Sequence, residues 1–142
     1  MIIELPYPPS LNSYYRHVGS KVMISKNGRL FRDQVNQIAI LDNVQNKFND
    51  KDLQVVITLY PPDRRKRDID NVLKCLFDSL THAKVWHDDS QVKRMFVEKN
   101  EPIEQGLVIV KIMEYQNDFF QHQSMSQFFD KICGNFNKKS IG

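Results

Sequence analysis

The sequence has few cysteines, and their spacing excludes two classes of small protein. Only two cysteines occur in 142 residues, Cys75 and Cys133, and they form no Cys-X-X-Cys pair. Disulfide-rich secreted domains carry more cysteines in a shorter chain, and cysteine-based zinc sites need closely spaced pairs. We therefore expect two reduced, mostly buried thiols and neither a disulfide framework nor a cysteine-ligated zinc site.

The sequence also contains no long apolar run and no glycine-rich loop. A membrane-spanning helix needs roughly 20 consecutive apolar residues, and no stretch of the chain approaches that length. The opening residues, Met1 to Pro6, lack the basic and apolar regions of a signal peptide, so we expect a cytoplasmic protein. The missing glycine-rich phosphate loop argues against nucleotide hydrolysis of the P-loop type.

The composition that remains is typical of one globular domain. Hydrophobic residues make up 41% of the chain and charged residues 26%, which excludes a wholly disordered protein. The formal net charge is only +3, but four positive residues follow one another, at Arg64, Arg65, Lys66 and Arg67. Because a patch of that density attracts a polyphosphate more strongly than the net charge suggests, it favours a nucleic-acid partner.

Hydrophobic patterning predicts an α/β or α+β fold, in which helices pack on a small mixed β-sheet. Runs rich in β-branched and apolar residues predict strands at Ile2–Leu5, Lys21–Ser25, Leu53–Tyr60, Val92–Lys99 and Leu107–Met113. Helical spacing of apolar residues predicts helices over 30–48 and Ile69–Leu80. Only a short connection separates the last two strands, so they could form a hairpin.

Turn signals and the tail complete the outline. Three prolines within 6–19 argue against a regular helix there, and Asn27-Gly28 predicts a turn. We expect a main domain over 1–115 and an extension over 116–142 that forms an amphipathic C-terminal helix. Its apolar face could pack on its own chain or on a partner, and it comprises Met125, Phe128, Phe129, Ile132, Cys133 and Phe136.

Two carboxylates and a lysine gather at the start of the helix that follows the basic run. Asp70 and Lys74 are four residues apart and share the face opposite the apolar stripe, while Asp68 stands at the helix entry. Asn71 and Asp78 also point away from the core. One aspartate at such a place is most simply a helix cap, but a second one beside four basic residues is harder to explain by capping.

A second acidic pair, Asp88 and Asp89, lies between that helix and the next strand. If the helix packs on the sheet, this loop can bring Asp89 back beside Asp68 and Asp70, although Asp-Asp-Ser is also common turn chemistry. Three gathered carboxylates repel one another unless a cation neutralises them. Mg²⁺ prefers carboxylate oxygens and water and supports phosphodiester hydrolysis, while Lys74 could offset phosphate charge.

Zinc is the rival metal in this region, and its signal is weaker. His82 and His87 are five residues apart beside the acidic pair, which is not a standard zinc spacing. His17 and His122 stand alone, and no histidine is evidently placed to activate a serine or cysteine nucleophile. The residues therefore favour hard-metal chemistry on carboxylates.

Taken together, these motifs resemble the RusA family of Holliday junction resolvases, which are crossover junction endodeoxyribonucleases. The resemblance rests on the run from Pro62 to Asn71 with Lys74, on Trp86 to Val92, and on the opening segment from Leu5 to Arg16. It covers the chain from Ile2 to about Tyr115. The tail extends past this family body, and His87 stands where an apolar residue is expected.

The resemblance implies a homodimeric nuclease that resolves four-way DNA by paired symmetric cleavage, leaving 5′-phosphate ends, in DNA recombination and repair. It implies that Asp68, Asp70, Asp89 and Lys74 are catalytic. It also implies that the three aspartates bind Mg²⁺, for which Mn²⁺ could substitute. The DNA-contacting residues that we assign are Arg64, Arg65, Lys66, Arg67, Asn71 and Arg16.

Other functions stay open at this stage. A DNA-binding protein without catalysis would use the acids only for capping and charge balance, and a less structure-selective nuclease for branched DNA would share the same site. Tyr14 and Tyr15 could stack on unpaired bases at the crossover, or they could pack the proline-rich segment onto the core. The two-fold symmetry of a four-way junction is an independent reason to expect a two-fold dimer.

Overall fold

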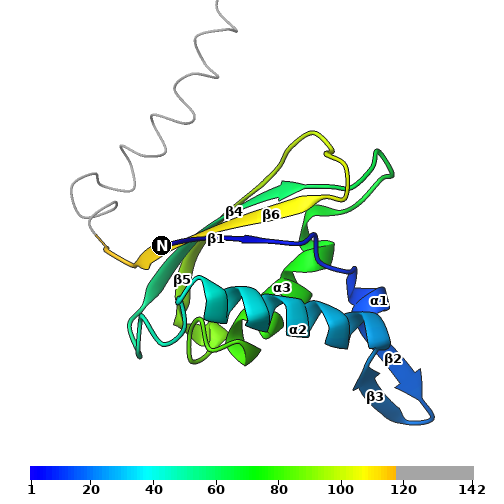
Figure 1. The fold of residues 1–142 in the computed structure, drawn as a ribbon, viewed down its shortest axis with the longest axis horizontal. Helices are drawn as coiled ribbons and strands as arrows, with labels where there is room; N and C mark the ends of the chain where they lie inside the picture. The colour runs from blue at the N-terminus through cyan, green and yellow to red at the C-terminus, as the bar shows by residue number, and fades with distance from the viewer. Residues whose placement is uncertain (118–142) are drawn as a thin grey trace, which may run out of the picture.

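The computed structural model describes residues 1–117 (Figure 1), so the expected C-terminal helix and Cys133 lie outside the described residues. Within them, a four-stranded sheet has the order β1-β6-β4-β5. Its strands are β1 (Ile2–Leu5), β4 (Leu53–Tyr60), β5 (Val92–Lys99) and β6 (Leu107–Glu114). β4 and β5 are parallel, and the other neighbours are antiparallel. This mixed sheet confirms the predicted fold class.

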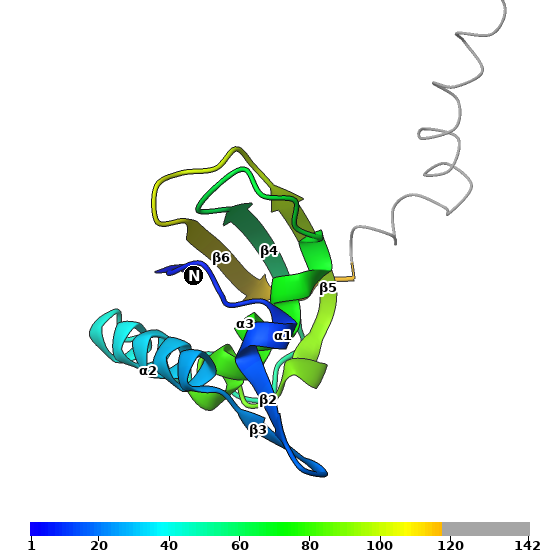
Figure 2. The same ribbon diagram turned by 90° about the vertical axis from the view of Figure 1, so that its right-hand side faces the viewer.

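Two helices, α2 (Lys26–Leu41) and α3 (Leu73–His82), cover one face of this sheet (Figures 1 and 2). Alternate residues of β4 are buried, because successive side chains of a strand point to opposite faces. The helices bury stripes at helical spacing, and Cys75 of α3 is fully buried as predicted. No helix within residues 1–117 is long and apolar enough to span a membrane.

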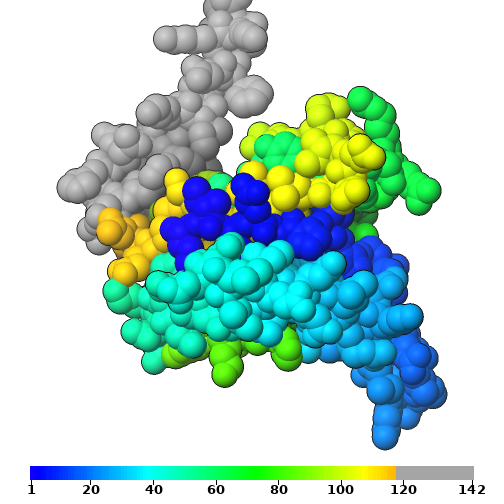
Figure 3. Space-filling view, in the orientation of Figure 1, coloured from blue at the N-terminus to red at the C-terminus, as the bar shows by residue number. Residues whose placement is uncertain are grey.

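A small hairpin protrudes from the body beside the start of α2 (Figure 3). It consists of β2 (Tyr15–Val18) and β3 (Lys21–Ile24), and a single helical turn, α1 (Leu11–Tyr14), precedes it. The sequence analysis predicted β3 but not α1 or β2. The prolines that argue against helix end at Pro9, so they leave the backbone after Ser10 free to form that turn.

The turn predicted at Asn27-Gly28 is wrong, because both residues belong to α2. Ser25 caps the helix, and its side chain accepts a hydrogen bond from the backbone N–H of Gly28, 3.0 Å away. Position 28 has no room for a side chain, so it must be a glycine. A Cβ atom on Gly28 would lie 2.6 Å from the carbonyl oxygen of Tyr14 and 2.7 Å from Cγ2 of Ile24.

The predicted helix over 30–48 ends earlier, at Leu41. Asn43 follows the C-cap with a positive φ of 52°, a left-handed conformation that asparagine adopts more readily than most residues and that stops a helix. Phe48 is nevertheless buried, in the loop that follows. The apolar side chain of Phe48 therefore indicated a buried position and not a continuation of the helix.

The last two strands do not form the hairpin that their short connection allowed, because β4 lies between β5 and β6. The connection over 100–106 crosses the end of β4, where Asn100 N–H donates to the carbonyl of Leu59 (2.8 Å) and Ile103 N–H to that of Pro61 (2.9 Å). A connection that passes over one strand must span about 10 Å, which is twice the spacing of neighbouring strands. The connection over 100–106 is long enough to do so. β5 therefore forms an edge of the sheet.

We predict that Gly28→Ala destabilises the fold by about 1–3 kcal/mol, because the added methyl group would overpack the contact with Tyr14. At an open helix position the same change would stabilise by up to about 1 kcal/mol. Chemical denaturation measures the difference. Gln37→Ala, at an exposed position of α2, is the control and should change stability by less than about 0.5 kcal/mol. A Gly28→Ala protein as stable as the original would contradict the close contact.

Candidate active site

The basic run forms a structured loop, Asp63–Arg67, which we call the basic loop. The Asp63 carboxylate accepts hydrogen bonds from the backbone N–H of Arg65 (2.9 Å) and from Nη1 of Arg67 (2.6 Å). From β5, Nζ of Lys99 donates to the carbonyl of Arg67 (2.8 Å). The sequence analysis assigned no role to Asp63 or Lys99, and the structure shows that they shape this loop.

The four positive side chains of the basic loop differ in their surroundings. Arg67 is only 22% exposed and is tied to Asp63, whereas Arg65 is 85% exposed. Arg64 is equally exposed, and its ion pair with Glu101 (3.3 Å) is weak because both groups are in solvent. Arg64, Arg65 and the exposed Lys66 are therefore free to reach a ligand, while Arg67 maintains the shape of the loop.

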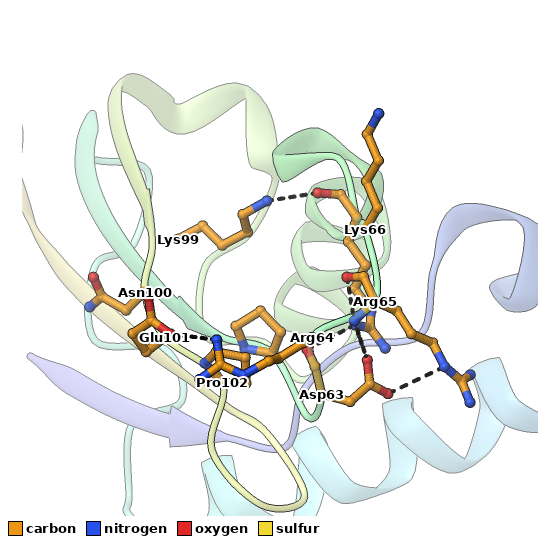
Figure 4. Close-up of a pocket in the computed structure, with 10 residues that line it drawn as sticks. Asp63, Arg64, Arg65, Lys66, Lys99, Asn100, Glu101 and Pro102 are labelled. Atoms are coloured by element: carbon orange, nitrogen blue, oxygen red, sulfur yellow. Dashed lines mark hydrogen bonds and ion pairs between the residues drawn. The ribbon is translucent and has the colours of Figure 1, made fainter.

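The basic loop is the wall between two open pockets. One pocket, of about 580 Å³, separates it from the turn after β5, and Figure 4 shows Lys99 and Glu101 facing the loop across it. The other pocket, of about 430 Å³, lies toward the N-terminal proline-rich segment and includes Asn71. Arg65 and Arg67 line both pockets. Asn71 thus shares a groove with two residues of the basic loop.

Asp68 and Asp70 lie just after the basic loop, where the chain enters a 3-10 helical turn, η1 (Ile69–Val72). Asp68 occupies the N-cap position, but its side chain makes no capping hydrogen bond. Both side chains are exposed, and neither carboxylate forms a hydrogen bond or ion pair within residues 1–117. Capping therefore does not account for the Asp68 carboxylate.

The two aspartates of the second acidic pair are used differently. Asp88 caps a second 3-10 turn, η2 (Asp89–Gln91), by accepting from Ser90 N–H (3.1 Å) and from the Ser90 hydroxyl. The Asp89 side chain is half-exposed and makes no hydrogen bond within the described residues. Serine and backbone hydrogen bonds also lower the pKa of Asp88. The pair thus contains one structural cap and one available carboxylate.

Gln91 fixes this second turn to the body of the protein. It is buried, its amide nitrogen donates to the carbonyls of Asn49 and Lys51 (2.8 Å each), and its oxygen accepts from the backbone N–H of Asp88 (3.0 Å). The sequence analysis assigned no role to Gln91. With a further hydrogen bond accepted from the backbone N–H of His87 (2.8 Å), these four bonds make it the anchor that holds the Asp89 turn in place.

Lys74 stands near the start of α3, and its partner is Asp78 of the same helix. Nζ of Lys74 donates to Oδ1 of Asp78 (2.8 Å), and the Tyr15 hydroxyl donates to Oδ2 (2.8 Å). The hydrogen bond to Asp78, followed by the charges of Asp78 and Asp89, raises the pKa of Lys74. Lys74 is therefore a cation at neutral pH, within electrostatic reach of Asp89.

The remaining expected residues lie outside this cluster. Arg16 is exposed on the protruding hairpin. Tyr14 is fully buried, which rules out base stacking in this structure and confirms the packing alternative for that residue. His87 Nδ1 lies 2.7 Å from a carboxylate oxygen of Asp50.

The described residues contain no ready-made metal cage. Within 1–117, no group of three or more histidines, cysteines, aspartates or glutamates is placed so that it could hold a metal ion. The packing nevertheless relates the two acidic regions, because η1 contacts β5 and α3 contacts η2. Asp68 and Asp70 thus belong to the turn that contacts β5, and Asp89 to the turn that contacts α3, where its charge acts on Lys74.

We predict that the Asp63 carboxyl titrates with a pKa of about 2, because the hydrogen bond from Arg67, and then that from Arg65, stabilises its charged form. A depressed pKa means that its contribution to folding is present above the ordinary value of 3.8 and is lost as the pH falls through about 2. An NMR titration of side-chain carboxyl carbons measures it, with Asp63→Asn identifying the signal. A pKa near 3.8 would show that the loop is not anchored in this way.

Comparison with known proteins identifies the family of this chain. Residues 6–113 match the family described as endodeoxyribonuclease RusA. The crossover junction endodeoxyribonuclease RusA of Shigella sonnei strain Ss046 is 39% identical over 120 residues, which cover 82% of this chain and 96% of the relative. The protein of that name from Enterobacteria phage HK97 is 40% identical over 113 residues, covering 80% and 93%. The Escherichia coli strain K12 protein is 38% identical over 120 residues, covering 82% and 96%.

The match spans the basic loop, both acidic turns and Lys74, and it extends over most of each relative. The chain belongs to the endodeoxyribonuclease RusA family.

Proposed function

We propose that this protein is a crossover junction endodeoxyribonuclease, which resolves Holliday junctions by symmetric cleavage of two strands. The relatives from Shigella sonnei and phage HK97 bear that name. The observation that carries the proposal is that Asp68, Asp70 and Asp89 have unpaired carboxylates within residues 1–117. Asp68 and Asp70 directly follow a loop whose cations Arg64, Arg65 and Lys66 are exposed. A protein that only bound DNA would gain nothing from unpaired carboxylates beside phosphate.

We propose further that a divalent metal, Mg²⁺, works with these carboxylates. Mg²⁺ at phosphate-processing sites is held by one or two carboxylates together with waters and substrate phosphates, so a complete protein cage is not required. Asp68, Asp70 and Asp89 are hard oxygen donors of that kind, and Mn²⁺ could use them as well. When bound, such an ion activates water and stabilises the leaving oxygen of a phosphodiester.

The protein's own residues bind and orient the DNA backbone in this proposal. Arg64, Arg65 and Lys66 contact phosphates, and Lys74, a cation beside Asp89, offsets charge on the non-bridging oxygens. Water attacks the phosphorus and the P–O3′ bond breaks, so that one strand end carries a 5′-phosphate and the other a 3′-hydroxyl. Asn71 lies in the groove with Arg65, where it can hydrogen-bond to the strand.

A homodimer is the assembly that fits this reaction. A four-way junction has near two-fold symmetry, and one site in each of two symmetric subunits would supply the paired incisions. We take residues 1–115 as the nuclease domain and 116–142 as an extension, since the family match ends at residue 113. A DNA substrate is consistent with the expected cytoplasmic location, and Arg16 on the hairpin could contact a further arm of the junction.

We predict that Asp70→Asn lowers the rate of junction cleavage at least about 100-fold, because the site loses a charged metal donor. Binding of a synthetic four-way junction without metal should persist, since the change removes a negative charge facing phosphate. Cleavage and gel-shift assays with and without Mg²⁺, against a linear duplex of equal length, measure both. Asp33→Asn, an exposed carboxylate of α2, is the control. Undiminished cleavage by the Asp70 variant would refute its role, and cleavage without metal would refute the metal.

We predict that Arg65→Ala weakens junction binding and lessens its salt dependence, because each lost phosphate contact reduces the slope of log K against log salt by about 0.9. Binding measured at several salt concentrations tests this. Lys47→Ala removes a similar exposed charge beside another pocket, lined by Met1 and Asn43, and should leave the slope unchanged. An unaltered slope for Arg65→Ala would remove the basic loop from the DNA contact surface.

A further inference from the structure

A chain of two hydrogen bonds connects the base of the protruding hairpin to Lys74. Tyr15, the first residue of β2, donates through its hydroxyl to Oδ2 of Asp78, and Lys74 donates to Oδ1 of the same carboxylate, both at 2.8 Å. The Asp78 side chain is 18% exposed, whereas that of Lys74 is 57% exposed. The carboxylate is thus held on the protein side and presents the ammonium group outward.

Helix stability is a weak reason for this arrangement. An exposed ion pair four residues apart on a helix contributes about 0.2–0.5 kcal/mol, and the order with the acid first is the better one. Here the lysine comes first and the aspartate second. Tyr15 moreover joins from a different element, which a purely helical pair would not need.

Tyr15, the donor at one end of this chain of hydrogen bonds, is held in place by its neighbours. Its neighbour Tyr14 is fully buried, and the two rings meet edge to face with centroids 4.7 Å apart. The Tyr14 carbonyl accepts from Ser25 N–H (2.8 Å), and Gly28 packs directly against it. A donor fixed in this way determines where the Asp78 carboxylate lies, and therefore where Lys74 is drawn.

One unpaired carboxylate, that of Asp89, lies within electrostatic reach of Lys74. Asp68, Asp70 and Asp89 have no ion-pair partner within residues 1–117, although the charge of Asp89 reaches Lys74. A lysine side chain is long and flexible, with about 2 kcal/mol of rotamer entropy. Without its own counter-ion it could swing onto the Asp89 carboxylate and compete with a metal for the same oxygens.

We propose that Asp78, oriented by Tyr15, is a positioning residue that keeps the Lys74 ammonium near the proposed metal-binding carboxylate of Asp89 but not on it. The inference rests on the proposed function of the site and adds to it a dedicated counter-ion for the lysine. Lys74 also lines an open pocket of about 540 Å³ with Leu11, Asn12 and Tyr15. From there its ammonium group faces an approaching phosphate.

Single-turnover cleavage of a four-way junction tests the proposal. Asp78→Asn, which is isosteric and uncharged, should reduce the cleavage rate about 10- to 100-fold and raise the Mg²⁺ concentration needed for half-maximal rate. Tyr15→Phe should show the same two changes to a smaller extent. Junction binding without metal and the thermal midpoint should stay close to those of Glu114→Gln, which removes an exposed ion pair with Lys51 and no contact of Asp78 or Lys74.

A double-variant comparison separates positioning from a general structural effect. In a Lys74→Ala background, Asp78→Asn should change the remaining rate by less than about twofold, because the residue to be positioned is gone. Independent, multiplying losses would overturn the proposal. Unchanged cleavage and unchanged Mg²⁺ requirement in Asp78→Asn alone would overturn it as well.

A measurement without DNA distinguishes failure of this inference from failure of the proposed function. In protein labelled with ¹³C-lysine, the Cε signal of Lys74, assigned by its loss in Lys74→Arg, reports the titration of the ammonium group. Asp78→Asn should shift its midpoint to lower pH, and Glu114→Gln should not. An unshifted midpoint overturns the contact itself. A shifted midpoint in a protein that cuts no junction instead refutes the proposed function.

Discussion

Parallel pairing of β4 with β5 is the constraint on which the rest of the site depends. Parallel neighbours need a crossover connection that packs on the sheet, and η1 with α3 supplies it by burying Leu76 and Leu80. The crossover leaves β4 through the basic loop and enters β5 through η2, so one packed unit carries both acidic turns. The register also sets Lys99 opposite Leu59, beside the exit of β4, from where Lys99 can bind the Arg67 carbonyl.

Carboxylates in this unit divide into two groups by their partners. Asp63, Asp78 and Asp88 accept hydrogen bonds that shape the basic loop, hold Lys74 and cap η2. Asp68, Asp70 and Asp89 have no such partner within residues 1–117. Because an unpaired carboxylate contributes little to folding, the second group is better explained by a ligand than by stability. Each unpaired acid has a paired one close by in sequence, which is why charge counts alone do not separate them.

Much of this could be predicted from the sequence, for identifiable reasons. The strands at Leu53–Tyr60 and Val92–Lys99 were predicted with their observed bounds. For Leu53–Tyr60 the reason is a run of β-branched and apolar residues that two prolines stop. The order of the strands in the sheet could not be predicted, since a connection of that length permits either a hairpin or a crossing of β4. The helix at Asn27-Gly28 was missed because the reason for Gly28 is its contact with Tyr14, which is distant in sequence. Asp78 was visible four residues after Lys74, but its second partner, Tyr15, is 63 residues away.

The three unpaired carboxylates do not form one group within residues 1–117, and this has a physical cause. Three negative charges brought together without a cation repel one another, and the cost falls when they stay apart in solvent. Asp68 and Asp70 are exposed, and Gln91 holds the turn that carries Asp89. We expect this arrangement of oxygen donors that come together only when a cation and a phosphate bind. In the proposed enzyme two cations are held as well, since Arg67 and Lys74 are each bound to their own aspartate. Such a site would keep these two positive charges in place before DNA arrived and would leave its unpaired carboxylates for a metal.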